Sequence, residues 1–444
     1  MLTLYKDVLL LFVAVALVMG SSPVYLTAAE PPARLPSDDI CSICGMYIQR
    51  FLRTAVYVEY AKGETESYCG VACAVRAINE AGRLDAVETA QVTSWTSRRR
   101  VPMKEATYVI GSKLVPDMLP NIIAFGSRAE ADSFMARKGG KLRPLSRLLE
   151  DTSYRGLTAP FRITPAAVPS AQVLNVAVNY ATRRMGGLLR GSHEISQAEG
   201  LAAATQVPAR MEMTLRTLGI GYGLTDEVFS QLSVPFASRD MTGAKRDGTS
   251  QETSTDGFGD ATLMTRWRFW HDTDYDRHLG ILAGVTLPTG DYRSALRTKA
   301  NVQEGLGAYA FTPGLLYSHR LGEFWFHAAA TYAFNRENSD DYRFGNCFKA
   351  GVAAHWLPNS RDLLGLEVDF ENTLANEYLG VNQANSGRRA AYASLVYQRR
   401  FLLVWGGNLN LNALFGVPLA EDVNGTQLGE KNHGLLGLQW QRKF

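Results

Sequence analysis

Four of the five cysteines lie within the first 73 residues of this 444-residue chain. Cys41 and Cys44 form one close pair, and Cys69 and Cys73 form the other. The segment GVACAVRAINEAG around the second pair has helical composition, so its two cysteines, four residues apart, project from one helix face toward the same point. A helix N-terminus also favours the thiolate, which is the form of cysteine that binds metals. The spacing therefore allows a tetrahedral set of four thiolates, which zinc accepts.

The other soft donors of this region are thioethers. Met46 directly follows Cys44-Gly45, and Met118 lies in GSKLVPDM, whereas all seven histidines lie at residue 193 or beyond. Thiolates and thioethers without imidazole favour Cu(I) over metals that prefer nitrogen or oxygen ligands.

In an oxidising compartment the two cysteine pairs could instead form structural disulfides, and the spacing alone does not separate these alternatives. A thiol oxidoreductase that uses Cys41 and Cys44 is disfavoured, because this pair does not clearly open a helix after a buried strand.

The N-terminus indicates export. Lys6 precedes an apolar run over 8–19, and small residues lead to Thr27-Ala28-Ala29, so residues 1–29 are expected to be a secretory signal peptide. The run is shorter than the roughly 20 apolar residues that a transmembrane helix needs, and no later stretch is long enough. We also expect no lipid anchor, since the residues before Cys41 are not the small ones that precede a lipid-modified cysteine.

Composition excludes some other classes of function. The formal net charge is +3, with 20% charged residues, and no run of Lys or Arg dominates the chain. These values argue against nucleic-acid binding. The sequence also contains no arrangement of Ser, His and Asp and no phosphate-binding loop that points to catalysis, so we expect no enzyme.

Residues 171–444 consist almost entirely of segments with period two. In LLGLEVDFEN, apolar residues at 364, 366, 368 and 370 alternate with glycine and acidic residues, which predicts a strand with one apolar and one polar face. Aromatic residues recur near the strand ends, as the interfacial girdles of a membrane barrel require. Short polar turns, such as 357–362, alternate with long polar loops, such as 237–257 and 372–386. About twelve segments result, and an even number lets the chain enter and leave on one side.

The change of pattern predicts a multidomain chain. Residues 36–150 mix helical and strand signals, including a hairpin over 54–68, and predict a small α+β domain. A proline-rich linker follows over 151–170, where three prolines exclude a continuous helix and fit an extended tether. Residues 171–444 then form an antiparallel transmembrane β-barrel of about twelve strands.

The polar face of the strands would line the lumen of this barrel. The candidate pore residues are Arg266, Arg268, Arg343, Lys349, His355, Glu367, Asp369 and Glu371. We expect these opposed charges to satisfy one another in a structural network that fills the interior, and a selectivity path for solutes is the alternative. Cys347 lies on the same face, where we expect a small packing residue.

Two short motifs of the second domain carry a resemblance. The chain ends on LLGLQWQRKF, in which Leu436, Leu438, Trp440 and the terminal Phe444 occupy one face of the last strand. This end resembles the closing strand of bacterial outer-membrane barrels, which the assembly machinery reads. The motif LPTGD at 287–291 is similar to that of the outer-membrane transporters named for the "MetA-pathway of phenol degradation". The resemblance covers residues 171–444. It implies the architecture of the barrel and says less about what the barrel transports.

The first domain carries a further set of motifs. They are Cys41-Ser-Ile-Cys44-Gly45-Met46, the small-residue helix at Cys69 to Cys73, Tyr108-Val-Ile-Gly-Ser112, Pro116-Asp-Met118 and the stretch from Ile123 to Gly140. Together, over residues 40–146, they resemble NosL, the copper-binding accessory protein of nitrous-oxide reductase. Within the stretch from Ile123 to Gly140, Ser127 and Glu130 predict a capping box at a helix start, and Gly139 predicts the helix end.

The resemblance to NosL implies an α+β copper-carrying domain in which Cys44, Met46 and Met118 fall on metal-relevant positions. That family is typically anchored through a lipid-modified cysteine, whereas the barrel could supply the membrane tether here. The candidate metal ligands are Cys41, Cys44, Met46, Cys69, Cys73 and Met118, with Cu(I) as the expected ion and zinc as the second choice.

These observations together predict a monomeric outer-membrane protein whose N-terminal domain lies in the periplasm and handles copper, by delivery, scavenging or transport. The expected partners are outer-membrane lipid and a periplasmic copper protein that donates or receives the ion. The alternative function is an outer-membrane solute channel whose N-terminal domain is held by disulfides and is structural or docks partners.

Overall fold

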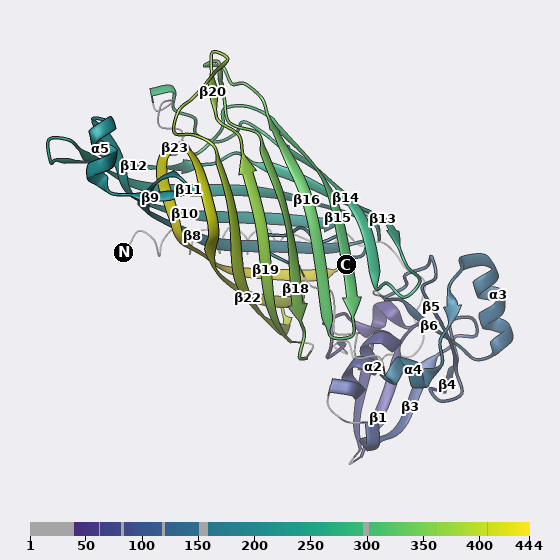
Figure 1. Ribbon diagram of the computed structural model, residues 1–444. Coiled ribbons are helices and arrows are strands. Elements are labelled where there is room, and N and C mark those ends of the chain that lie inside the picture. The colour runs from purple at the N-terminus through teal and green to yellow at the C-terminus, as the bar shows by residue number, and fades with distance from the viewer. Residues whose placement is uncertain are drawn as a thin grey trace. The chain divides into compact units, whose positions relative to one another are not determined.

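The computed structural model describes residues 40–61, 63–80, 84–117, 120–150, 159–295, 302–359, 361–405 and 407–444. The expected signal peptide at 1–29 and the candidate ligand Met118 lie outside these residues. Among the residues described, no helix combines the length and the apolar character that a bilayer crossing requires. The chain forms a small α+β region over 40–150 and a β-barrel region over 159–444 (Figure 1).

The α+β region contains two small antiparallel sheets. Its strands are β1 (Val56–Tyr60), β2 (Glu64–Tyr68), β3 (Val87–Thr93), β4 (Arg100–Pro102), β5 (Thr107–Ile110), β6 (Ile122–Phe125) and β7 (Lys141–Leu142). The first sheet has the order β2-β1-β3-β4 and the second has the order β6-β5-β7. The hairpin predicted over 54–68 is present, because β1 pairs with β2 from Val56↔Tyr68 to Tyr60↔Glu64.

Helix α2 lies at the centre of this region. The helices are α2 (Val71–Glu80), α3 (Arg128–Lys138) and α4 (Leu145–Glu150), with short 3-10 helices at Ile48–Phe51 and Leu84–Ala86. All residues of α2 from Val71 to Ile78 are buried, and the helix contacts β1, β2, β6 and α4. A helix that is buried on every face needs small and apolar side chains, and the sequence VACAVRAI supplies them around a single arginine.

Helix α3 begins and ends where the sequence predicts. The Ser127 hydroxyl accepts a hydrogen bond from the Glu130 backbone N–H at 3.3 Å, and Gly139 adopts a φ of 69° after the last turn. The Glu130 carboxylate accepts from the backbone N–H of Gly126 at 3.0 Å, one residue before the position that a capping box requires. The helix therefore has the predicted N-cap, but the Glu130 carboxylate accepts its hydrogen bond from the loop before the helix and not from the N-cap residue.

The second region is a closed antiparallel barrel. The wall strands are β8 (Val173–Gly191), β10 (Gln206–Gly223), β11 (Val228–Lys245), β13 (Thr262–His271), β14 (Arg277–Thr286), β15 (Ala310–Leu321), β16 (Phe324–Asn335), β18 (Cys347–Trp356), β19 (Asp362–Thr373), β22 (Arg388–Val404) and β23 (Gly407–Lys443). They pair in this order, and β8 pairs with both β10 and β23, which closes the wall.

Strand β23 makes two passes of the wall. Residues 407–423 pair with β22, whereas residues 423–443 pair with β8. The strand doubles back near Gly425, which has a φ of 75°, so that a Cβ atom on Gly416 would lie 2.1 Å from Nε2 of His433. The eleven wall strands therefore provide twelve passes of the chain, as predicted, and the chain enters and leaves at the same end.

Several elements lie outside the wall. Strands β9 (His193–Ile195) and β12 (Ser250–Phe258) extend the sheet beyond β8 and β11, near helix α5 (Gln197–Ala203) (Figure 1). The prediction of a loop over 237–257 was wrong for most of its length, because β11 and β12 continue there as a paired hairpin. This stretch consists mainly of polar and small residues and has no apolar face, so its sequence gave no strand signal.

A separate three-stranded sheet lies in the long loops. It consists of β17 (Tyr342–Arg343), β20 (Glu377–Tyr378) and β21 (Val381–Asn382). Arg343, which we expected to line the lumen, belongs to this sheet and forms an ion pair with Glu377. The assignment of Arg343 to the pore was therefore wrong, because the wall strand begins only at Cys347.

The outer face of the wall is apolar. The exposed fraction is 69% for Leu315 and 65% for Leu395, and the apolar residues of β14 are exposed at every second position. Aromatic residues near the strand ends are also exposed, among them Trp267, Phe269, Tyr309, Phe311, Phe324, Phe334 and Trp356. Side chains of this kind belong in lipid, so the alternation confirms the prediction of a transmembrane barrel.

The connections between wall strands alternate in length. The short ones are 224–227, 272–276, 322–323, 357–361 and 405–406, and the long ones are 192–205, 246–261, 287–309, 336–346 and 374–387. The final hairpin at Gly425 is the exception, since it is a tight turn at the end that carries the long loops. This asymmetry agrees with the predicted arrangement of short turns on one side of the membrane and long loops on the other.

Candidate metal centre and barrel lumen

A tight loop brings the first cysteine pair together. The Cys41 backbone N–H donates to the Met46 carbonyl at 2.9 Å, and the Gly45 N–H donates to the Cys41 carbonyl at 2.9 Å. Gly45 has a φ of 77°, which favours glycine because it has no Cβ atom. The glycine after Cys44 therefore lets the loop fold back on itself.

The second pair lies where β2 leads into α2. Cys69 directly follows β2, and Cys73 lies in the first turn of α2. The Thr54 hydroxyl donates to the Cys69 carbonyl at 2.7 Å and fixes the backbone at that junction. The four sulfur atoms of Cys41, Cys44, Cys69 and Cys73 all lie within 4.8 Å of one another.

The spacing of these sulfurs fits a single ion. The Sγ atoms of Cys44 and Cys69 are 3.4 Å apart, and those of Cys69 and Cys73 are 3.6 Å apart. Four thiolates placed about 2.3 Å from a tetrahedral metal lie about 3.8 Å from one another. A disulfide requires about 2.05 Å, and all four cysteines are free in this structure. The cluster therefore has the dimensions of a tetrahedral thiolate site.

The pKa values of the cysteines shift in opposite directions. Burial acts to raise the pKa of Cys41, but hydrogen bonds from Cys44, Cys69 and Cys73 outweigh it and hold this pKa well below the ordinary value. Hydrogen bonds to Cys41 and Cys44, together with burial, raise the pKa of Cys69 and of Cys73 well above it. In the free cluster, Cys41 therefore ionises more readily than an ordinary cysteine, whereas Cys69 and Cys73 hold their protons more tightly.

Only one of the four cysteines is accessible. Cys41 and Cys69 are 0% exposed and Cys73 is 1% exposed, whereas Cys44 is partly exposed. Met46 is buried in the same core as the cysteines. An ion or a partner thiol would therefore meet Cys44 first.

The structure adds a residue that sequence reasoning did not single out. Asp117 is 1% exposed, and its Oδ2 atom would lie 1.6 Å from a Cβ atom on Gly70. Gly70 separates Cys69 from α2, so this carboxylate lies against the cysteine loop. Its signal in the sequence is its place in Pro116-Asp-Met118, one of the segments that resemble NosL, but nothing in its type distinguished it from other acidic residues.

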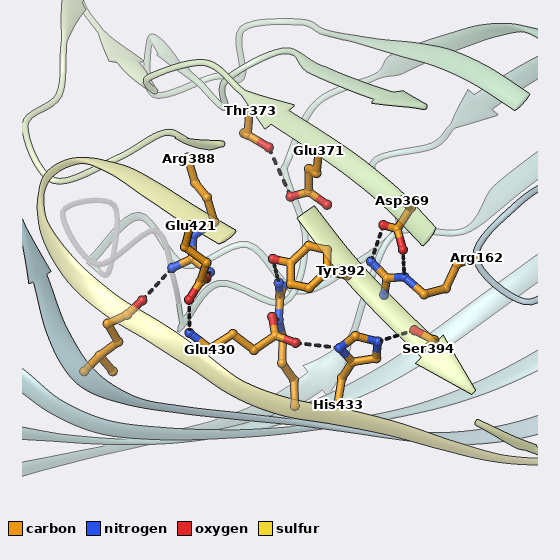
Figure 2. A network of polar contacts seen from close by, with 12 residues as sticks. Arg162, Asp369, Glu371, Thr373, Arg388, Tyr392, Ser394, Glu421, Glu430 and His433 are labelled. Atoms are coloured by element: carbon orange, nitrogen blue, oxygen red, sulfur yellow. Dashed lines mark hydrogen bonds and ion pairs between the residues drawn. The ribbon is translucent and has the colours of Figure 1, made fainter. Parts of the chain in front are cut away.

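Charged and polar residues inside the barrel form a connected network (Figure 2). His433 donates or accepts at both ring nitrogens, with Nδ1 2.6 Å from Oε1 of Glu430 and Nε2 3.0 Å from the Ser394 hydroxyl. Arg183 contacts the second carboxylate oxygen of Glu430 and donates to the Tyr392 hydroxyl at 2.7 Å. Each polar group thereby finds a partner away from bulk water.

Most of the predicted pore residues lie in this interior. Lys349 pairs with Glu371 at 3.1 Å, and Nε2 of His355 lies 3.3 Å from Oε1 of Glu367. Arg268 is buried and donates to the Asp226 carbonyl at 2.7 Å. The pair of Lys349 and Glu371 matches the expected network of opposed charges, whereas Arg268 meets a backbone carbonyl instead of an acidic side chain.

Cys347 lies at the start of β18, apart from the other cysteines. Its sulfur accepts a hydrogen bond from the Thr373 hydroxyl at 3.3 Å. No group of three or more potential metal-ligating residues other than the four-cysteine cluster occurs among the described residues.

Two family models match the chain. The model described as "Putative MetA-pathway of phenol degradation" matches residues 190–416, slightly more than half of the sequence. The chain belongs to this family. The model described as NosL matches residues 32–152. Both resemblances drawn from the sequence are thus confirmed, although no curated protein matches the chain.

Solved structures resemble each part separately. An outer membrane channel from Pseudomonas putida F1 has 17% sequence identity and a TM-score of 0.47, and the match covers 65% of this chain and 100% of that one. The copper chaperone NosL from Shewanella denitrificans has 19% identity and a TM-score of 0.23, covering 26% of this chain and 96% of that one. A FadL homologue from Pseudomonas aeruginosa has 12% identity and a TM-score of 0.30, covering 64% and 95%.

The contact between Gly70 and Asp117 gives a first prediction. Gly70→Ala should force the buried Asp117 carboxylate away from the cysteine loop and destabilise the α+β region by about 1–3 kcal/mol. Hydrogen exchange of peptides from residues 40–117 in the full chain measures this effect. Gly126→Ala is the control, because its Cβ atom would meet only ordinary contacts at 3.6 Å. Equal exchange in the two variants would contradict the proposed packing.

The lumen network gives a second prediction. A Cβ atom at Gly416 would lie 2.1 Å from Nε2 of His433 and 2.5 Å from the Ser394 hydroxyl. Gly416→Ala should break the hydrogen bond between them and destabilise the barrel by about 1–3 kcal/mol. Gly434→Ala, in the same strand, would meet its nearest atoms at 3.5 Å and should be neutral. The temperature at which the folded barrel loses its faster migration on denaturing gels distinguishes the two variants, and identical temperatures would refute the argument.

Proposed function

We propose that the chain is an outer-membrane protein that handles copper, with Cu(I) as the cargo of its four-cysteine cluster. The observation that carries the proposal is the convergence of Cys41, Cys44, Cys69 and Cys73 in a region whose sequence has no histidine. Soft thiolates without imidazole suit Cu(I) better than metals that prefer nitrogen or oxygen, and zinc is the second choice. The match to NosL, whose solved relative is named a copper chaperone, supports the same cargo.

The proposed arrangement in the cell follows from the two regions. Residues 1–29 direct export, residues 36–150 lie in the periplasm, residues 151–170 connect the domains, and residues 171–444 span the outer membrane as a monomer. The apolar outer face of the barrel supports contact with lipid. A periplasmic copper protein would donate the ion or receive it.

Transfer would proceed by exchange of sulfur ligands. The partly exposed Cys44 would form the first bond to the incoming ion, as a bond to the donor's sulfur breaks. The Cys41 thiolate would follow, and Cys69 and Cys73 would bind after losing their protons. Met46 and Met118 are proposed as neutral thioether donors. The oxidation state of the ion does not change, so no redox partner is needed.

A second candidate function is a solute channel whose first domain is held by two disulfides. The family description, which concerns phenol degradation, favours small-molecule traffic through the barrel. Intact-mass analysis of the full chain, purified from outer membranes without reductant, separates the two functions. A mass lower by four hydrogen atoms supports the disulfide form, and free thiols with a bound ion support the carrier.

Anaerobic titration of the reduced full chain against a chromophoric Cu(I) chelator tests the carrier directly. Cys44→Ser should weaken Cu(I) retention by more than the roughly 10- to 100-fold that loss of an outer partner causes. Cys347→Ser is the matched control, because this cysteine lies outside the cluster, and it should bind like the unmodified chain. Equal retention by the two variants, or retention of zinc in place of copper, would refute the assignment.

The protonation of the four cysteines gives a further prediction. Because the pKa values of Cys69 and Cys73 are raised in the free cluster, both thiols must release protons to bind as thiolates. Affinity for Cu(I) should therefore rise as pH rises and fall as pH falls, since protons compete with the ion. Calorimetric titration in buffers of different ionisation enthalpy measures the protons released, and a value below two per ion at neutral pH would contradict this model.

A further inference from the structure

Four methionines meet on one face of the barrel wall. Met185 of β8 pairs directly with Met211 of β10, and Met211 pairs in turn with Met241 of β11. Met213 lies two residues after Met211 and therefore on the same face of β10. Because directly paired residues point to the same side of a sheet, the register places four thioether side chains next to one another across three adjacent strands.

This face is the inner one. Met213 pairs with Arg183, whose guanidinium contacts Glu430 and Tyr392 in the interior network. Met211 is 2% exposed and packs with Val302 and Leu428, and the other three methionines pack against this buried centre. Val302 belongs to the long connection 287–309, so the cluster lies toward the end of the wall that carries the long connections.

The distribution of methionine argues for more than packing. Methionine often fills irregular gaps in apolar cores. Residues 171–444 contain five methionines, at 185, 211, 213, 241 and 264, and all but Met264 belong to this one cluster. A filler without further purpose would be spread over the interior, whereas these thioethers are concentrated at one place.

The other apolar clusters inside the barrel contain no methionine among the residues described. They form around residues 159–170, of which Phe161, Ala166 and Ala167 each pack into one, against Leu, Val, Ala and Trp side chains. The backbone N–H groups of this segment donate to Glu367 and Ser318 on the wall. Aliphatic and aromatic residues are therefore sufficient to fill the lumen elsewhere.

A buried carboxylate next to the cluster lacks hydrogen bonds. The side chain of Glu304 is 0% exposed, and neither of its oxygens has a hydrogen-bond partner among the described residues. It lies two residues after Val302, and its Oε1 atom is 3.9 Å from Nη1 of Arg239, which pairs directly with Met213. A buried carboxylate without hydrogen bonds is unfavourable, and a cation bound at the thioethers would offset its charge.

The fixed charges beside the cluster are paired. Arg183 and Arg239 lie opposite Met213 on its two neighbouring strands. Arg388 donates to the Leu428 carbonyl at 2.6 Å. Each of these arginines faces a carboxylate, in the pairs Arg183–Glu430, Arg239–Glu304 and Arg388–Glu421. Farther along the lumen, Lys349 and His355 also face carboxylates, those of Glu371 and Glu367. A monovalent ion at the thioethers would therefore meet no excess of fixed positive charge beside the cluster.

We propose that Met185, Met211, Met213 and Met241 form a second soft-metal site of the chain, which binds Cu(I) through neutral thioether sulfurs. Thioethers are soft ligands that select Cu(I) over harder ions. Unlike thiols they form no disulfides, so the site keeps its ligands in an oxidising medium. The site lies in the barrel and needs no cysteine. The proposal therefore goes beyond the four-cysteine carrier and does not depend on it.

A full-length chain without thiols isolates the site. All five cysteines are replaced by serine, so that thioethers are the only sulfur donors left, and faster migration on denaturing gels confirms that the barrel is folded. This chain should retain Cu(I) anaerobically against a chromophoric chelator. Adding Met211→Leu and Met213→Leu, which conserve volume, should weaken retention by at least about tenfold, as loss of ligands exceeds loss of an outer partner.

Met264→Leu in the same cysteine-free chain is the matched control, because Met264 lies outside the cluster, and it should leave retention unchanged. Equal retention by the two methionine variants, or no retention by the cysteine-free chain, would overturn the site. Neither result bears on the carrier, which is tested with its cysteines in place. Conversely, a cysteine-free chain that binds Cu(I) as predicted supports the thioether site even where the carrier fails.

Protection from oxidation tests the site in the unaltered chain. Hydrogen peroxide converts accessible methionine to its sulfoxide, and Met185, Met213 and Met241 are partly exposed. Ag(I), a soft monovalent ion that peroxide does not oxidise, is added in excess over the cysteine cluster. Oxidation of these three residues, measured by peptide mass spectrometry, should slow by at least about tenfold at saturation, since only the ion-free fraction reacts. Met264 should oxidise at the same rate with and without Ag(I). Unchanged oxidation of the cluster, or equal slowing at Met264, would refute the proposal.

Discussion

The barrel depends on one interaction above others, which is the pairing of the charged and polar side chains taken into its interior. An unpaired buried charge costs several kcal/mol, whereas a paired and hydrogen-bonded one is tolerated. The wall meets this requirement with pairs such as Lys349 and Glu371, and with the chain from Ser394 through His433 to Glu430. The backbone of residues 159–170 supplies further partners, since Glu367 and Ser318 accept hydrogen bonds from its N–H groups. The contents of the lumen are thus as much a part of the fold as its wall.

The barrel was largely predictable, because lipid imposes a simple rule on strands. Each wall residue faces either hydrocarbon or the interior, so alternation such as that of 364–370 fixes both the strand and its orientation. This rule does not apply to strands that extend outside the membrane. The hairpin of β11 and β12 rises beyond the wall, where neither face needs to be apolar, and Arg343 lies in a loop sheet for the same reason.

The cysteines of the candidate metal centre were more predictable than their surroundings. Cysteine is rare, and four cysteines in two close pairs pointed to one site, which the structure brings together. The contact of Asp117 with Gly70 and the lodging of residues 159–170 in the barrel could not be foreseen. Both depend on segments distant in sequence meeting in space, and neither leaves a periodic signal. The three prolines correctly excluded a helix, but composition does not tell a solvated tether from a buried one.

The seam between β8 and β23 has a consequence for how the protein is built. These are the first and last strands of the wall, so the cylinder can be completed only after the C-terminal residues have been delivered. Residues 159–170 lie shortly before β8, and their backbone is hydrogen-bonded to inward-facing side chains of the wall. During biogenesis the growing sheet must therefore wrap around a segment already in place, or else that segment must thread into a finished cylinder. In the first order of events, the interior contents would be a template on which the cylinder forms.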